Sequence, residues 1–422
     1  MKETLVKILK AVLKRLASVT LWRYRPGIIG VTGSVGKTST KMAIAAVLKG
    51  DRLIRFAQGN FNNEIGLPLT ILGDYSEVKG IFFWMSVIFR SLWQILGPKN
   101  THYPELLILE YAADKPGDIK YLLSIARPNV SIITAIGDIP VHVEFYNEAE
   151  EVAREKGRLI EFLPTAGFAI LNKDDEAVLN LKDRTRAHLM TFGFNRGSDL
   201  RITNFETRIF EGVPTGLSFK LEYGGSTVPV KIDHAIGKAQ GYAAAAAAAV
   251  GIAFGFNLIK VSDRLKNYQP PRGRMNLVRG IKSSLILDDS YNASPMSMHA
   301  ALDTLRDLPA KRKIAVLGDM TEIGSYTIGA HETLGRLAAD VVDILVTVGP
   351  RGKIIAESAQ KTGLNKKNIQ VFEDVDEAKK PIRELIRKGD LVLVKASHII
   401  QLNEIVEEIQ ELREFHLEKK ED

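Results

Sequence analysis

A glycine-rich stretch near the start of the sequence, GVTGSVGKTST at 30–40, has the residues of a phosphate-binding loop. Its glycines free the backbone to wrap a phosphate, its lysine brings positive charge to the β- and γ-phosphates, and the hydroxyl that follows suits magnesium. The longer Walker pattern has glycine where this chain has Val31, so the match is to a compressed variant. The stretch therefore predicts an ATP site formed by Gly33, Ser34, Val35, Gly36, Lys37, Thr38 and Ser39.

Three more side chains could take part in metal or phosphate chemistry, although each is weak evidence alone. Glu110 ends the apolar stretch ELLILE, and α/β sheets place ligand-binding groups at this carboxyl edge, where a carboxylate can hold Mg²⁺. His142 lies in IPVHVEF and Lys156 in AREKGRLI. A glutamate at a strand end is more often solvated, and a single lysine on a helix is usually a surface charge. Residue types alone leave both interpretations open.

The elements that would position these residues alternate between strand and helix. The glycine loop is followed by a helical pattern over about 37–49 and by apolar strands at 106–113 and 130–138. This alternation predicts a mostly parallel, doubly wound α/β sheet. Residues 160–232 alternate apolar and polar side chains between Gly and Pro, which predicts an antiparallel β appendage. The alanine-rich stretch 239–256 is expected to be a buried core helix.

A linker and a second α/β domain follow. The segment KNYQPPRGRMN at 266–276, with two prolines and a glycine, is the best linker candidate. Five apolar strands separated by helical stretches come after it, which predicts a Rossmann-like α/β domain. The predicted domains are a basic amphipathic helical segment at 1–25, a central ATP-binding domain at 26–268 and a C-terminal domain at 269–422.

Composition limits the class of protein. The chain has 422 residues, enough for two or three domains, and a hydrophobic content of 45%, ordinary for a globular protein with buried cores. It has no cysteine, which excludes thiol catalysis, cysteine-ligated zinc and disulfides, and fits a reducing compartment. The cytoplasm is the expected location.

Positive charge is concentrated at the N-terminus. The net charge is +7, and residues 1–25 hold seven basic residues against the single acid Glu3. The rest of the chain is nearly neutral and has no basic stripe with interleaved aromatic residues. This distribution argues against a nucleic-acid partner.

Two apolar segments raise the question of a membrane. Within residues 1–22, apolar side chains from Leu5 to Val19 recur at helical spacing with lysines opposite, as in a basic amphipathic helix. A block at 81–97 is broken by Arg90 and is shorter than the ~20 residues that span a bilayer, so no transmembrane helix is expected. By default the two segments pack on each other and cover the core. The alternative is peripheral docking on an anionic membrane.

In their order and sequence context these motifs resemble the Mur ligase family, the ATP-dependent ligases that build the peptide stem of peptidoglycan. The resemblance covers about residues 26–408. It is closest to the D-alanyl-D-alanine-adding, MurF-type branch, through GNFNNEIGLPLTIL at 59–72, DDSYNASPMSM at 288–298, and LGDMTEIG followed by His331. Other branches typically have an Ala-His pair where this chain has Tyr291-Asn292.

The resemblance implies roles for individual residues. A substrate carboxylate would attack the γ-phosphate of ATP to give an acyl phosphate, and an amine would then displace phosphate. Lys37, Glu110, His142 and Lys156 would be catalytic, with Lys156 carbamylated so that it positions a second Mg²⁺. The implied metal ligands are Thr38, Glu110, His142 and Lys156. Beyond the loop, the implied nucleotide contacts are Asn172, Gln240, Arg274, Asp289 and Asn292. The implied substrate contacts are Asn60, Asn62 and Asn63.

The sequence departs from the family pattern in three places. Only about 25 residues precede the core, so the usual N-terminal UDP-binding domain is expected to be absent, which puts UDP recognition in doubt. Gln240 stands where the family commonly has an asparagine that meets adenine. His398 stands where the family has an arginine in Lys-Gly-Ser-Arg, which puts the second substrate in question.

The resulting expectation is a monomeric, cytoplasmic ligase that uses ATP and two Mg²⁺ ions to add D-alanyl-D-alanine to a muramoyl tripeptide in peptidoglycan synthesis. Contact with the inner face of the membrane through residues 1–22 stays open. One alternative is a Mur-like ligase that acts on a non-UDP acid, such as a lipid-linked, poly-glutamate-type or cofactor substrate. The other is a non-catalytic nucleotide-binding partner subunit. Consumption of ATP only when an acid and an amine are both present would separate them.

Overall fold

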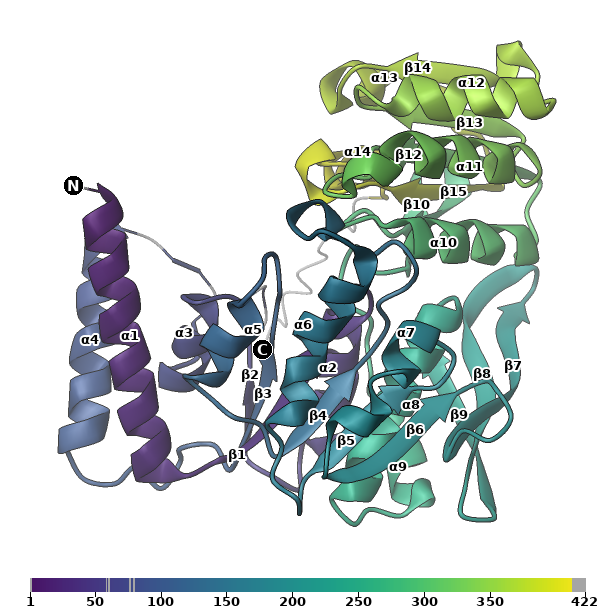
Figure 1. Ribbon diagram of the computed structural model, residues 1–422. Helices are drawn as coiled ribbons and strands as arrows, with labels where there is room; N and C mark the ends of the chain where they lie inside the picture. Colours follow the sequence, from purple (N-terminus) through teal and green to yellow (C-terminus); the bar gives the residue numbers. More distant parts are fainter. Residues whose placement is uncertain (1, 58, 60, 76, 79, 412–422) are drawn as a thin grey trace, which may run out of the picture. The chain divides into compact units, whose positions relative to one another are not determined.

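The computed structural model describes residues 2–411 except 58, 60, 76 and 79, and Figure 1 shows its helices and strands. The chain forms two compact units. The first runs to Pro271 and includes the short loop Glu322–Ser325, and the second takes up the chain from Arg272. The change from one unit to the other falls inside the segment 266–276 that the sequence marks as a linker.

The first unit is built on a nine-stranded sheet with the order β2-β3-β1-β4-β5-β6-β7-β8-β9. Strands β2 to β6 pair in parallel, and β7, β8 and β9 continue the same sheet in antiparallel pairs. This arrangement confirms the expected α/β fold with an antiparallel part. The strands are β1 (Gly27–Thr32), β2 (Ile54–Phe56), β3 (Leu106–Glu110), β4 (Val130–Ile133), β5 (Phe168–Asn172), β6 (His188–Gly193), β7 (Leu200–Phe210), β8 (Val213–Tyr223) and β9 (Ser226–Asp233).

The antiparallel part begins later than the sequence suggested, so the predicted range 160–232 was wrong at its start. Strands β5 and β6 lie within that range but pair in parallel with the core strands, and antiparallel pairing begins only at β7. The helix between β5 and β6, α7 (Glu176–Leu179), has four residues. Such a short helix is too brief for a helical repeat to show in the sequence, which hid a strand-helix-strand unit.

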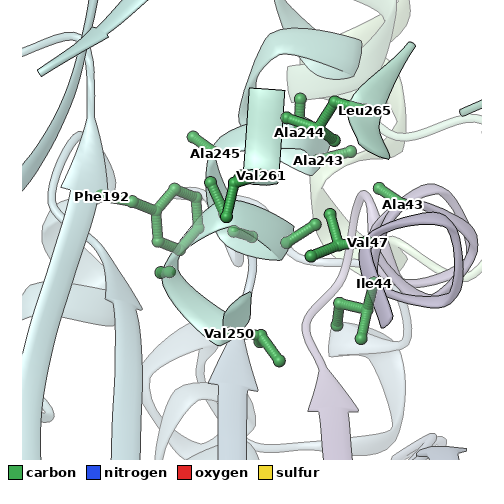
Figure 2. Close-up of a cluster of buried hydrophobic side chains, with 14 of the residues drawn as sticks. Ala43, Ile44, Val47, Phe192, Ala243, Ala244, Ala245, Val250, Val261 and Leu265 are labelled. Carbon is green, nitrogen blue, oxygen red and sulfur yellow. The ribbon is translucent and has the colours of Figure 1, made fainter. Parts of the chain in front are cut away.

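Helix α8 (Lys238–Ala253) lies in the main core of this unit, as expected for the alanine-rich stretch. Residues Ala243–Ala249 are all buried, and Figure 2 shows alanines of α8 near Val47 of α2 (Lys37–Leu48). A Cβ on Gly251 would come 2.9 Å from Cγ1 of Val47, so small residues let the two helices approach closely. This packing fixes α2 and the loop before it. Further helices are α3 (Gly66–Leu72), α5 (Asp118–Leu123), α6 (Ala149–Glu161) and α9 (Leu258–Leu265).

Helices α1 (Lys2–Tyr24) and α4 (Gly80–Leu96) lie side by side in the first unit (Figure 1). Together with α3 and α5 they enclose a second core. Arg23 donates a hydrogen bond to the carbonyl oxygen of Gly97 (2.7 Å), which ties the end of α1 to the end of α4. The two segments therefore pack on each other, as expected by default, but one side of α4 stays exposed. Among the described residues, no helix combines the length and hydropathy that crossing a membrane requires.

The second unit is a six-stranded α/β sheet with the order β10-β11-β15-β12-β13-β14. All neighbouring strands pair in parallel except β10, which runs antiparallel to β11. This confirms the expected Rossmann-like C-terminal domain. The strands are β10 (Asn276–Gly280), β11 (Ser284–Asp288), β12 (Arg312–Gly318), β13 (Ile344–Val348), β14 (Ile369–Phe372) and β15 (Asp390–Lys395). The helices are α10 (Pro295–Asp307), α11 (Thr327–Ala339), α12 (Gly352–Thr362), α13 (Val375–Leu385) and α14 (Asn403–Ile409).

Candidate active site

The glycine loop between β1 and α2 has the geometry of an anion-binding turn. Gly33 has φ 145°, and a Cβ there would lie 2.1 Å from Oγ1 of Thr134, so only glycine fits. Gly36 has φ 91°, in the left-handed region, and forms the N-cap of α2. In α2, which is described throughout, the first turn has no acidic residue and no side-chain cap. The amides and the dipole at this helix end are therefore oriented to hold an anion such as phosphate.

Hydrogen bonds fix the loop and its lysine. The amide of Ser34 donates to the carbonyl oxygen of Ala135 after β4 (2.6 Å), and Nζ of Lys37 donates to the carbonyl oxygen of Gly33 (2.7 Å). The ammonium group is therefore held against the loop that would carry the phosphates. Thr38 and Ser39 follow in the first turn of α2.

Glu110 lies at the end of β3, beside the glycine loop. Strands β3 and β1 are neighbours, and Glu110 is in register with Val31. The side chain is buried, and neither carboxylate oxygen has a hydrogen-bond partner in the described part of the chain. Nζ of Lys41 lies 2.8 Å from Oε1 and is itself buried. A buried carboxylate without hydrogen bonds is unusual, and oxygen donors of this kind suit a divalent cation.

Lys41 is a functional candidate that the sequence analysis missed. It follows Lys37 by four residues, so both lysines lie on the same side of α2. Its ammonium also donates to the carbonyl oxygen of Gly59 (3.2 Å). The four-residue spacing of Lys37 and Lys41 is visible in the sequence. Lys41 reaches Glu110 only because β3 lies next to β1, and the sequence does not reveal that strand order.

His142 lies close to two carboxylates, which favour its charged form, whereas burial favours the neutral form. Its backbone has φ 71°, and Nε2 lies 3.3 Å from Oδ1 of Asp114, while Nδ1 lies 2.8 Å from Oε2 of Glu322 in the loop that belongs to this unit. Burial, followed by the charges of Lys156 and Lys37, lowers the pKa of His142 to about 3. A neutral imidazole is the form that binds metals.

Lys156 is buried in α6 and is easily deprotonated. Burial and the charge of Lys37 lower its pKa to about 7, against the opposing effect of Asp114 and Glu155. A large part of this lysine is therefore an uncharged amine near neutral pH, the form that can react with carbon dioxide.

The first unit thus brings several of the predicted catalytic residues together. The charge of Lys37 acts on both His142 and Lys156, the charge of Lys156 acts on His142, and Glu110 lies on the strand next to the loop. Within the described residues, no group of three or more carboxylate and imidazole side chains could hold a metal ion alone. The carboxylate of Glu110 is an oxygen donor of the kind that suits Mg²⁺, and the ligand set of Thr38, Glu110, His142 and Lys156 stays a prediction.

Two predicted nucleotide contacts of this unit are already hydrogen-bonded within the protein. Asn172 is buried at the end of β5, and its Oδ1 accepts the amide of Asp174 (3.0 Å). Gln240 is buried in the first turn of α8, and its Oε1 accepts the hydroxyl of Tyr268 (2.5 Å). A contact between adenine and this oxygen of Gln240 would compete with the hydrogen bond from Tyr268. The nucleotide contacts of Asn172 and Gln240 both stay predictions.

Three asparagines in GNFNN, at 59–63, are predicted to contact substrate. Asn60 lies outside the described residues. The carbonyl oxygen of Asn62 accepts the amide of Ala112, two residues after Glu110 (3.0 Å). Oδ1 of Asn63 accepts the amides of Ile65 (3.1 Å) and Gly66 (2.9 Å), which fixes the chain at the start of α3. The structure thus gives Asn63 a role in local folding, and substrate contact stays a prediction.

In the second unit, Asp289 and Asn292 meet at Lys395. Oδ2 of Asp289 lies 2.6 Å from Nζ of Lys395, and the carbonyl oxygen of Asn292 accepts a hydrogen bond from the same ammonium (2.9 Å). Burial raises the pKa of Asp289 and lowers that of Lys395. Oδ1 of Asp289 accepts the amide of Met275 (3.0 Å), which fixes the segment that carries Arg274.

Aromatic contacts complete this cluster. The guanidinium of Arg274 lies 4.2 Å from the ring centre of Tyr291, and the ring of His398 stacks on the same tyrosine at 5.1 Å. The histidine that departs from the family pattern therefore lies close to predicted nucleotide contacts. The sequence analysis singled out Tyr291 only as a branch mark.

Family models match both units. The Mur ligase middle domain matches residues 31–86 and 94–251, and the Mur ligase glutamate ligase domain matches residues 273–398. Together they cover the glycine loop, Glu110, His142 and Lys156 in one unit and Arg274, Asp289 and Asn292 in the other.

Individual proteins extend the comparison. The chain is 30% identical to the UDP-N-acetylmuramoyl-tripeptide–D-alanyl-D-alanine ligase of Bacillus subtilis over 94% of this chain and 79% of that protein. It is 28% identical to the ligase of the same name from Escherichia coli, over 91% of this chain and 77% of that protein. The structure matches MurF from Thermotoga maritima in complex with ADP with a TM-score of 0.76 and 28% identity, over 94% of this chain and 83% of that one.

Proposed function

This chain belongs to the Mur ligase family, and we propose on that premise that it adds D-alanyl-D-alanine to a muramoyl tripeptide in peptidoglycan synthesis. It is an ATP-dependent ligase that forms a carbon–nitrogen bond. The observation that supports the proposed site most directly is the buried carboxylate of Glu110 next to the glycine loop, where it pairs with Lys41.

The proposed reaction has two steps. A carboxylate oxygen of the acid attacks the γ-phosphorus of ATP, the bond to the β-γ bridging oxygen breaks, and ADP leaves behind an acyl phosphate. The free amine of the dipeptide then attacks the acyl carbon, phosphate leaves with its bonding electrons, and the amine loses a proton. In the proposed arrangement the loop amides and Lys37 bind the transferring phosphoryl group, and their positive charge offsets the charge that develops on its oxygens.

Thr38, Glu110, His142 and Lys156 would hold Mg²⁺, which supplies charge neutralisation at the β- and γ-phosphate oxygens when it is bound. Lys156 would contribute oxygen ligands only after carbamylation, because an amine at this position offers nitrogen alone. Its low pKa supports this modification, since the neutral amine attacks CO₂, the new N–C bond forms, and one proton is released.

Carbamylation gives a direct prediction. Protein equilibrated with ¹³C-labelled bicarbonate is expected to show a carbamate carbon signal in NMR spectra. At constant dissolved CO₂ the signal should be strong at about pH 8 and weak at about pH 6, because the fraction of neutral Lys156 rises through its pKa of about 7. Lys156→Ala should abolish the signal, and Lys49→Ala, at an exposed position after α2, should keep it. A signal that survives Lys156→Ala would place the modification on another lysine.

The test of the function itself is phosphate release by purified protein with Mg-ATP, UDP-linked muramoyl tripeptide and D-alanyl-D-alanine, with each left out in turn. We expect release above background only with all three, because the amine is needed for turnover and the acid is needed to accept the phosphoryl group. Mass spectrometry should find the tripeptide extended by the dipeptide. Background release in every mixture would contradict the proposed substrates.

If phosphate release stays at background in every mixture, other acids are tested next. Replacing the UDP-linked acid with the same peptide on a lipid carrier, or with poly-glutamate-type acids, tests whether the ligase takes a non-UDP acid. Release that needs one of these acids would keep the ligase chemistry and replace the substrate.

The remaining proposals concern the setting of the reaction. Because the reaction consumes ATP and a nucleotide-linked peptide, we place it in the cytoplasm, with the chain acting as a monomer and without nucleic acid. Contact with the inner face of the membrane is a separate proposal, because it depends on α1 and α4 and not on the ATP site.

A further inference from the structure

One side of α4 is an apolar surface that the described residues of the chain leave uncovered. Six large apolar side chains on this helix, each 42–79% exposed, recur every three or four residues and so lie on one side. They are Phe82, Met85, Phe89, Leu92, Trp93 and Leu96, and together they are called the α4 face. On the opposite side, Val87 and Ser91 are buried against the second core. A domain in water rarely exposes a continuous row of six large apolar side chains, so we expect the α4 face to bind a partner.

The one charged residue of α4 is positive, and exposed basic residues lie on the neighbouring helix α1. Arg90 is the single charged residue of α4, and residues 80–104 contain no aspartate or glutamate. On the adjacent α1, Lys7 and Arg15 are exposed. Two other lysines of α1 serve a different purpose, because Lys10 pairs with Glu64 and Lys14 donates to Ser124 (2.6 Å), which anchors α1 on the unit. Positive charge therefore lies on α4 and on the neighbouring α1, and the acids Asp74 and Glu77 precede α4 in the chain.

We propose that the α4 face inserts into the interface of an anionic lipid membrane, with Arg90 and the exposed Lys7 and Arg15 of α1 at the headgroups. A helix binds to such a membrane surface through the burial of apolar side chains and through the attraction of basic residues to anionic lipids. Helix α4 has 17 residues, roughly 26 Å in length, and Arg90 lies within it, so the helix lies along the membrane plane and does not cross it. Trp93 sits among the aliphatic residues of the face, and tryptophan favours the headgroup region.

The first experiment uses sucrose-loaded vesicles of pure phosphatidylcholine, or of equal parts phosphatidylcholine and phosphatidylglycerol, and the full-length protein without nucleotide or peptide. Cosedimentation with the anionic vesicles is expected to be at least about tenfold stronger than with neutral ones at low salt, and to weaken at high salt. The triple variant Phe82→Ser/Phe89→Ser/Leu96→Ser should lower the partition coefficient by about 100-fold, since exposed apolar side chains are lost. The matched control Phe210→Ser/Ile259→Ser/Ile328→Ser removes equally exposed apolar side chains elsewhere and should bind like the wild type.

The second experiment uses the protein's own fluorescence. All three tryptophans lie in this pair of helices, Trp22 in α1 and Trp84 and Trp93 in α4. With brominated lipids, a variant that keeps only Trp93 should be strongly quenched and blue-shifted. A variant that keeps only Trp84, which packs edge-to-face on Phe83 towards the core, should change much less.

Three outcomes would overturn the proposal. Binding that is equal for neutral and anionic vesicles would remove the assignment to an anionic surface. Equal quenching of Trp84 and Trp93 would mean that another surface is inserted. A dimer in sedimentation experiments without lipid, made monomeric by the triple variant and showing no vesicle binding, would assign the α4 face to a second copy. None of these measurements uses the ligase reaction, so their failure would leave the proposed function untouched.

Discussion

Replacing Lys37 by alanine is expected to lower kcat for phosphate release by about 10³-fold with saturating ATP, muramoyl tripeptide and D-alanyl-D-alanine. The side chain lies against the glycine loop, with its ammonium 2.7 Å from the carbonyl oxygen of Gly33. Phosphoryl transfer leaves little covalent work to the protein, so the loss of one positioned charge removes much of the stabilisation of the transition state. The measurement is steady-state phosphate release, followed by a single-turnover assay for the acyl phosphate.

The controls separate chemistry from folding. Lys49→Ala removes a lysine from an exposed position just after the same helix and should leave turnover unchanged. Lys37→Arg keeps the charge but changes the shape of the donor, and most of the activity should still be lost. The thermal transition of Lys37→Ala should stay within a few degrees of the wild type. Near-normal turnover of this folded variant would show that the glycine loop is not where phosphate is transferred.

The sequence predicted those features of the candidate site that depend only on residues close to one another in the chain. The glycine loop could be recognised because strand, glycines, lysine and helix follow one another within a few residues, and φ 91° at Gly36 explains why glycine is needed there. Glu110 could be predicted because it ends an apolar run, and strand ends form one edge of a parallel sheet.

The parts that the sequence could not supply depend on contacts between distant segments. The pairing of Lys41 with Glu110 requires β3 to lie beside β1, and nothing in either segment states that order. Large apolar residues occur on both the covered and the exposed side of the block at 81–97, so its sequence could not tell which side would be covered. The sequence also did not show that the side chain of Asn63 accepts the amide of Gly66 at the start of α3, and its predicted contact with substrate stays a prediction.

The second large effect is expected at the buried ion pair of Lys41 and Glu110. Lys41→Met should lower the free energy of unfolding by about 3–5 kcal/mol in the presence of EDTA, because the buried carboxylate would lose the ammonium group that pairs with it. Denaturant unfolding followed by tryptophan fluorescence is suited to this measurement, since all three tryptophans belong to the first unit. Lys49→Met, at an exposed position after the same helix, should change stability by less than about 0.5 kcal/mol.

A double-mutant cycle distinguishes an ion pair from a packing defect. Glu110→Met alone should also be destabilising, because it leaves the ammonium of Lys41 buried next to an apolar side chain. The double variant Lys41→Met/Glu110→Met should recover most of the loss, since replacing both charges by apolar groups of similar volume is often neutral. Losses that simply add would mean that the two charges do not interact and that each substitution damages packing separately.

Magnesium then tests whether Glu110 is a metal ligand. If Mg²⁺ binds this carboxylate, the cation should replace the missing charge in Lys41→Met, and added Mg²⁺ should raise the stability of that variant more than that of the wild type. In Glu110→Met and in the double variant the response should disappear, because the oxygen ligand is gone. The same readout needs neither ATP nor substrate. An equal response of all four proteins would assign the pair to the stability of the fold and would remove Glu110 from the proposed metal site.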